Sequence, residues 1–199
     1  MIFERGFFDS YKSVASIQSL NESISRTRFF NSRSIKSASG VTVFISHKHE
    51  DLDLGELDGI LGMLRSYNII PYIDSMDINM PNETCEETAK RIKEVIQFCN
   101  KFILLATNKA IESYWCNWEV GIGDVHKYKQ NIAILPMRDK GQYESNYKGN
   151  EYLQLYSSIE YFNGNTNYSN GRSIEAGYYV RTPTSENYAI ETLRNWLNK

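Results

Sequence analysis

The stretch that decides the fold is VTVFISHKHED, which covers residues 41–51. Its first half, Val41–Ile45, is a short run of β-branched and aromatic residues, and such a run is typical of a buried strand. Its second half, Ser46–Asp51, is polar and leads to a segment in which apolar residues recur every three or four positions. The residues with this spacing are Leu54, Leu57, Ile60 or Leu61, and Leu64. The pattern predicts a strand, a polar loop and an amphipathic helix.

This unit of strand and helix is repeated further along the chain. Strands are predicted at Ile69–Ile73, Phe102–Ala106 and Ile132–Leu135, and Pro136 is expected to end the last of them. Segments with helical spacing lie between these strands, so each connection is long enough for a right-handed crossover between parallel strands. The predicted fold class is α/β: a doubly wound, mostly parallel sheet with helices on both faces. Pro71 cannot donate a ladder hydrogen bond, which favours an edge position or a strand start at this point.

Two parts of the chain depart from this pattern. Residues 1–39 are rich in serine and basic residues, and we interpret them as an N-terminal extension that is partly helical between Ser10 and Ser25. The main domain is predicted at 40–199, with a regular part at 40–136 and a less regular C-terminal part at 137–199. In that part, Tyr152–Tyr156 fits a strand or a short helix, and the spacing over Ser185–Leu197 predicts a final amphipathic helix.

Composition excludes several classes of function. The net charge of −2 gives no electrostatic case for binding nucleic acid or an anionic membrane. No apolar run approaches the ~18–20 residues that span a bilayer, and Glu4 and Arg5 interrupt the N-terminal apolar run, as no signal peptide would. The three cysteines form no CxxC pair, which fits a reducing cytoplasm better than a disulfide framework.

Sequence motifs for bound cofactors and metals are also missing. There is no GxGxxG, GxxxxGK[ST] or GxSxG, which disfavours a Rossmann dehydrogenase, a P-loop ATPase and an α/β-hydrolase. His47 and His49 could chelate a metal as an HxH pair, but no thiol or carboxylate cluster accompanies them in the sequence. We therefore predict no metal and no cofactor.

Three polar features should meet at one edge of the sheet, because ligands of open α/β sheets bind beyond the carboxyl ends of the strands. They are the loop at 46–51, the loop at 74–82, and the helix that carries Trp115 and Glu119. Trp115 and Glu119 are four residues apart, so they share one helix face, whereas Trp118 is expected to face the core. This convergence predicts a binding site at the edge.

The motifs at these positions resemble those of the Toll/interleukin-1 receptor (TIR) domain family, which has a flavodoxin-like sheet. They are Val43–His47 followed by Glu50-Asp51, then Tyr72–Asp74, then Ser113–Glu119, and the match covers residues 40–136. The Trp-x-x-x-Glu spacing resembles the bacterial and plant TIR domains that cleave NAD⁺. The HKHED loop and the two extensions are similar to the TIR proteins of the Thoeris anti-phage system, which convert NAD⁺ to a cyclic ADP-ribose isomer that activates a partner effector.

The resemblance implies an NAD⁺ glycohydrolase or ADP-ribosyl cyclase that takes NAD⁺ as substrate rather than as cofactor. It implies a catalytic role for Glu119, and the residues it implies for substrate binding are Phe44, Ser46, His47, Asp74 and Trp115. It also implies self-association through TIR contacts, which we expect to involve the 74–82 loop, and an effector reached through a nucleotide product.

Other interpretations of the same residues stay open at this stage. Phe44 could belong to the core, Ser46 could cap the next helix, and His47 could be an ordinary surface residue. The chain as a whole could be a non-catalytic TIR adaptor that acts by self-association, because such scaffolds need neither tryptophan nor glutamate at these positions. It could also be a nucleoside deoxyribosyltransferase-like enzyme, which would use a glutamate on a different substrate.

Overall fold

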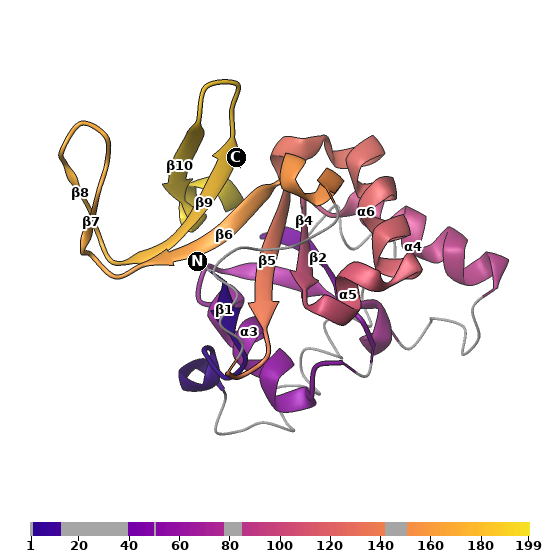
Figure 1. The fold of residues 1–199 in the computed structure, drawn as a ribbon. Coiled ribbons are helices and arrows are strands. Elements are labelled where there is room, and N and C mark those ends of the chain that lie inside the picture. Colours follow the sequence, from indigo (N-terminus) through magenta and orange to yellow (C-terminus); the bar gives the residue numbers. More distant parts are fainter. Residues whose placement is uncertain (1, 13–39, 50, 78–84, 142–150) are drawn as a thin grey trace.

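The computed structural model describes residues 2–12, 40–49, 51–77, 85–141 and 151–199. Within them an eight-stranded sheet has the order β10-β9-β6-β5-β4-β2-β3, with β1 beside β5 (Figure 1). The strands are β1 (Phe3–Glu4), β2 (Val41–Ser46), β3 (Ile69–Tyr72), β4 (Lys101–Ala106), β5 (Ile132–Arg138), β6 (Ser157–Phe162), β9 (Gly177–Pro183) and β10 (Tyr188–Thr192). A separate hairpin, β7 (Thr166–Asn167) with β8 (Ser173–Ile174), extends away from the body of the molecule.

The predicted parallel sheet is confirmed. Strands β3, β2, β4, β5 and β6 pair in parallel in this spatial order, and β9 and β10 continue the sheet in antiparallel pairs. Strand β3 lies at the edge of the sheet, which is one of the two options that Pro71 favoured.

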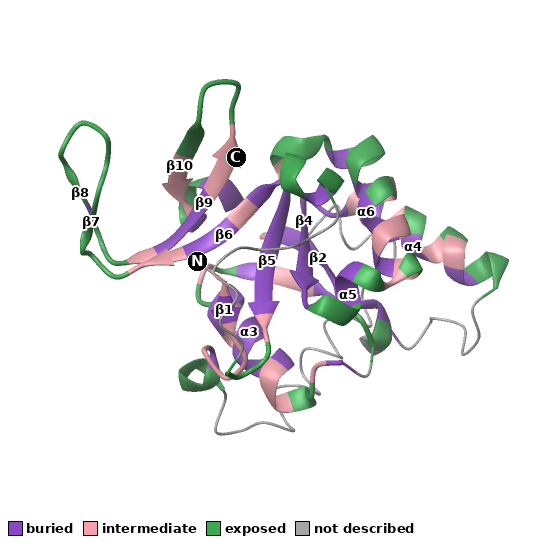
Figure 2. Cartoon of the chain, in the orientation of Figure 1, coloured by how far each residue is buried: buried purple, intermediate pink, exposed green. Residues whose placement is uncertain are grey.

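Helices cover both faces of the sheet. The longer ones are α3 (Leu54–Arg65), α4 (Glu86–Phe98) and α6 (Tyr114–Lys127), and the short ones are α5 (Asn108–Glu112), α7 (Leu193–Leu197), η1 (Asp9–Tyr11), η2 (Asp74–Met76), η3 (Lys129–Asn131) and η4 (Glu151–Leu155). Successive strand residues point to opposite faces. Val43 and Ile45 therefore join the core beneath α3, whereas Phe44 joins the core beneath α4 and α6. Figure 2 shows the central strands buried along their length.

The predicted helix over Ser185–Leu197 is wrong in its first half. Residues Tyr188–Thr192 form strand β10, which pairs antiparallel with β9, and helix α7 begins only at Leu193. Tyr, Ile and Thr at alternate positions favour a strand, and pairing with β9 outweighs the helical spacing. The Thr192 side chain caps α7 by accepting a hydrogen bond from the Asn195 N–H at 3.2 Å. Of the two options for 152–156, the short helix is found, as η4.

Pro136 does not end its strand. Strand β5 continues to Arg138, and on its outer side it pairs first with β6, up to Ile134, and then with β1, from Met137. Pro136 falls in the gap between these two partners, where a missing N–H interrupts neither pairing.

The described part of the N-terminal segment, residues 2–12, is packed into the domain. Strand β1 pairs in parallel with the end of β5, and Phe3 and Phe8 are buried in the core beneath α3. The rest of the helix expected between Ser10 and Ser25 lies outside the described residues. None of the helices in the described part of the chain combines the length and apolar character needed to cross a bilayer.

Candidate active site

The site is centred on a hydrogen bond between two elements that are distant in the sequence. Ser46 is the last residue of β2, and its Oγ donates to Glu119 Oε2 at 2.5 Å. Glu119 lies on α6, whose N-cap Ser113 accepts from the Cys116 N–H at 3.4 Å. Ser46 is not the cap of α3, because Asp53 fills that role by accepting from the Glu56 N–H. The Ser46 hydroxyl is therefore available to hold the carboxylate.

Glu119 is a buried carboxylate with one satisfied oxygen. Its side chain is 1% exposed, and Oε1 has no hydrogen-bond partner among the described residues. Burial raises the pKa of Glu119 well above its ordinary value, and the charge of Asp74 raises it further, whereas Ser46 and Trp115 act to lower it. A buried polar atom without a partner costs roughly 1–3 kcal/mol, so this geometry is maintained at a cost in stability. Such sites are candidates for function.

The loops after β2 and β3 meet beside this pair. His49 Nε2 lies 3.0 Å from both carboxylate oxygens of Asp74, and the rings of His47 and His49 are 5.3 Å apart. His47 is 7% exposed, and burial lowers its pKa to about 4, against the opposing charge of Asp74. The imidazole of His47 is therefore neutral at physiological pH.

Phe44 and the two tryptophans of α6 all contact the core. Phe44 is fully buried and stacks between Tyr72 and Phe102, so its ring belongs to the core, and a contact with substrate stays a prediction. Trp118 is only half-buried, as Trp115 is, and their rings pack 4.9 Å apart. Both indoles pack against the core beneath α4 and α6, as expected for Trp118, and Trp115 also lies close enough to Glu119 to lower its pKa.

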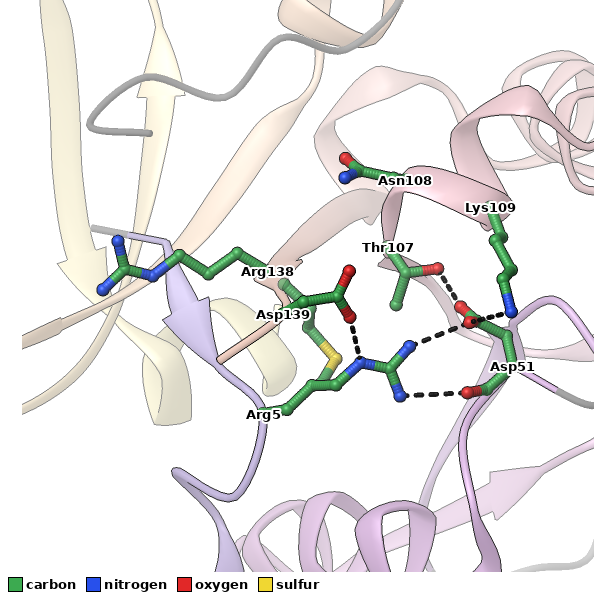
Figure 3. Close-up of a pocket in the computed structure, with 8 residues that line it drawn as sticks. Arg5, Asp51, Thr107, Asn108, Lys109, Arg138 and Asp139 are labelled. Atoms are coloured by element: carbon green, nitrogen blue, oxygen red, sulfur yellow. Dashed lines mark hydrogen bonds and ion pairs between the residues drawn. The ribbon is translucent and has the colours of Figure 1, made fainter. Parts of the chain in front are cut away.

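A cavity of about 380 Å³ lies at the same edge of the sheet, and none of the predicted site residues lines it. Figure 3 shows that its side chains converge on Arg5, whose guanidinium pairs with Asp51 at 2.8 Å and with Asp139 at 2.7 Å. Asp51 also accepts a hydrogen bond from Thr107. This cluster was not predicted, because Arg5 comes from the segment interpreted as an N-terminal extension. Since Arg5 is engaged by carboxylates, the cluster ties β1 to the edge loops.

The geometry thus brings together four of the six predicted site residues, namely Ser46, His47, Asp74 and Glu119, with Trp115 one turn before Glu119. His49 was considered only as half of an HxH pair, and its contact with Asp74 was not foreseen. What this arrangement offers chemically is a buried carboxylate that can stabilise a cation, beside two imidazoles and an aromatic surface.

Comparison with known proteins agrees with the fold. Residues 43–173 match the family model described as "TIR domain". The chain is also 29% identical over 119 residues to a Bacillus cereus (strain MSX-D12) protein named "Probable 3' cyclic ADP-D-ribose synthase ThsB'". That alignment covers 59% of this chain and 59% of the relative, so the chain spans about three-fifths of the length of the relative it matches.

Proposed function

The chain belongs to the TIR domain family, and we propose on this basis that it cleaves the nicotinamide–ribose bond of NAD⁺ and cyclises the ADP-ribose product. The Bacillus cereus relative carries the name of a cyclic ADP-ribose synthase, which supports the same reaction here. The observation that carries the proposal is the carboxylate of Glu119, held by Ser46 at 2.5 Å with its second oxygen buried and without a partner among the described residues.

The chemistry suits a single carboxylate. When the bond between ribose C1′ and the nicotinamide nitrogen breaks, both electrons leave with nicotinamide, which departs as a neutral molecule. The ribose is left as an oxocarbenium-like cation, so no strong general acid is required. Glu119 is proposed to stabilise this cation electrostatically.

The product depends on which nucleophile reaches C1′. Attack by water gives ADP-ribose and a proton, whereas attack by a hydroxyl of the same ADP-ribose gives a cyclic nucleotide and a proton. Exclusion of water favours the cyclic product. The half-buried pair Trp115 and Trp118 is a candidate wall for this purpose, and Trp115 is also proposed to stack on a base of the substrate.

The wider role proposed is signalling in bacterial anti-phage defence, with NAD⁺ as substrate and no further cofactor needed for bond cleavage. The nucleotide would act on a separate effector, and the reaction would take place in the cytoplasm, where NAD⁺ is abundant. Self-association is part of the proposal. A head-to-tail contact through the 74–82 loop, of which residues 78–82 lie outside the described residues, would place a neighbour's residues near Glu119, and such contacts can extend into filaments.

The deciding experiment incubates the protein with NAD⁺ and identifies the products by mass spectrometry. Glu119→Gln keeps the shape of the side chain and an acceptor for Ser46, and it should lower turnover on the order of 10²-fold or more. Glu112→Gln is the matched control, because Glu112 is exposed on α5, and it should turn over NAD⁺ like the wild type.

Equal turnover by the wild type and Glu119→Gln would remove this carboxylate from the mechanism. Turnover by neither protein, at concentrations that allow assembly, would favour a non-catalytic adaptor. Cleavage of a deoxynucleoside in place of NAD⁺ would favour the deoxyribosyltransferase-like alternative. A cyclic product, rather than ADP-ribose alone, separates a signalling cyclase from a hydrolase.

A further inference from the structure

The loops after β2 and β3 bring together three side chains that are typical metal ligands. One donor atom from each of His47, His49 and Asp74 lies within 4.8 Å of the other two. This cluster is not apparent in the sequence, because Asp74, whose carboxylate completes the HxH pair, lies 25 residues beyond His49. The fold supplies the third ligand by placing the ends of two adjacent parallel strands side by side.

The spacing of these donors is close to that of a tetrahedral site. Zinc bonds of roughly 2.0–2.1 Å to nitrogen and oxygen place neighbouring ligand atoms roughly 3.3 Å apart. The His49–Asp74 edge is already 3.0 Å, to either carboxylate oxygen. An approach of His47 by up to roughly 1.5 Å would complete three corners.

His47 adds an independent observation. Its ring is more than nine-tenths buried, and Nδ1 has no hydrogen-bond partner among the described residues. A buried donor or acceptor in a native protein is almost always satisfied. A ligand that draws the His47 ring toward His49 and Asp74 would account for its burial in a polar cluster.

We propose that His47, His49 and Asp74 bind one divalent transition-metal ion of the Zn²⁺ class. Two imidazoles and one carboxylate are a donor set that suits zinc, whereas Mg²⁺ and Ca²⁺ prefer oxygen ligands alone. Three protein ligands leave a fourth position for water or for an oxygen of a substrate. The bound ion would also join the loop after β2 to the loop after β3, next to the serine that holds Glu119. The site does not depend on the proposed NAD⁺ reaction.

The test uses Co²⁺ as a spectroscopic probe of the untagged full-length chain. All variants carry Cys85→Ser, because the exposed Cys85 thiol could bind the ion independently. We expect visible d–d absorption that saturates near one equivalent of Co²⁺, without a thiolate charge-transfer band. Added Zn²⁺ should then displace Co²⁺ and abolish the d–d absorption.

His49→Ala is the main variant, because the His49 side chain is about half exposed and its loss should not prevent folding. It should weaken Co²⁺ binding by roughly tenfold or more. His126→Ala is the matched control, since His126 is exposed on α6, and it should bind as the parent does. Asp74→Asn should resemble His49→Ala.

The proposal is overturned if no saturable d–d absorption appears, or if His49→Ala binds Co²⁺ as tightly as the parent. Circular dichroism checks the fold of each variant, and if Asp74→Asn does not fold, the comparison between His49→Ala and His126→Ala still decides. NAD⁺ cleavage does not enter this titration. Failure of the metal site therefore leaves the proposed enzyme standing, and the converse also holds.

Discussion

Gly59 tests whether the N-terminal segment is truly part of the core. This glycine lies inside helix α3, where alanine would ordinarily be the better helix former. A Cβ added at Gly59 would lie 2.6 Å from the backbone oxygen of Phe8, a separation that real Cβ atoms essentially never show. Gly121, inside helix α6, has nothing within 4 Å of the same position. The two sites share a helical backbone and differ in what the methyl group would meet.

The expected difference follows from two opposing contributions. Both Gly59→Ala and Gly121→Ala gain about 1 kcal/mol in helix propensity. Gly59→Ala also introduces an overpacked contact, which costs about 1–3 kcal/mol when neighbours must shift. The contact could also be relieved by detaching residues 2–12 from α3. Detachment costs at least as much, because it would expose Phe3 and Phe8 at about 1.5–3 kcal/mol each. Because the propensity gain cancels between the variants, Gly59→Ala should be less stable than Gly121→Ala by about 1–3 kcal/mol.

Urea-induced unfolding, followed by circular dichroism at 25 °C, measures this difference as a change in the free energy of unfolding. Gly121→Ala should unfold at a higher urea concentration than the wild type, with an unchanged m-value. If Gly59→Ala is stabilised as much as Gly121→Ala, residues 2–12 do not pack on α3 as described. The ion pairs of Arg5 at the edge of the sheet would then also be in doubt, because they require the same packing of residues 2–12.

Two further predictions concern ionisation. Under the proposed mechanism the ionised form of Glu119 is active, so kcat/KM, which reports the free enzyme, should rise with pH through the raised pKa of Glu119. Ser46→Ala removes a hydrogen bond that lowers this pKa and should move the acidic limb of the kcat/KM profile to higher pH. Asp74→Asn removes a charge that raises this pKa and should move the limb to lower pH. Thiol alkylation at pH 8 should modify only Cys85 in the native protein, because Cys85 is exposed. Burial raises the pKa of Cys99 to about 12 and also shields Cys116 from the reagent. Rapid modification of more than one thiol, counted by mass spectrometry, would contradict the described packing.

The central sheet could be predicted because its signals are local. The apolar run at Phe102–Ala106 and the β-branched and aromatic run at Val41–Ile45 each indicate a strand without reference to any partner. Pro71 narrowed the options to an edge position or a strand start, since a missing N–H is a property of the residue itself, and the structure shows the edge position. The same local reasoning failed at Tyr188–Thr192, where apolar spacing fits a helix but an available neighbour, β9, makes a strand the better solution.

The candidate site also has features that could be predicted from the sequence and features that could not. Strand ends of a parallel sheet share one edge, so the convergence of Ser46 and the helix of Glu119 at that edge could be predicted, whereas their hydrogen bond could not. The contact between His49 and Asp74 depends on how two loops fold over that edge, which periodicity does not specify. The place of Arg5 could not be predicted for another reason. Arg5 follows β1, and a strand of two residues is too short to show a sequence pattern.

The burial of Glu119 connects the fold to the proposed chemistry. A carboxylate that is 1% exposed, near the charge of Asp74, has its pKa raised, so burial disfavours its ionised form in the ligand-free protein. NAD⁺ carries its positive charge on the nicotinamide ring, at the bond that breaks. A cation placed beside Glu119 favours the ionised form, and under the proposed mechanism the cation that develops at ribose C1′ in the transition state does the same. Under this proposal the Glu119 carboxylate becomes fully ionised only when substrate is bound.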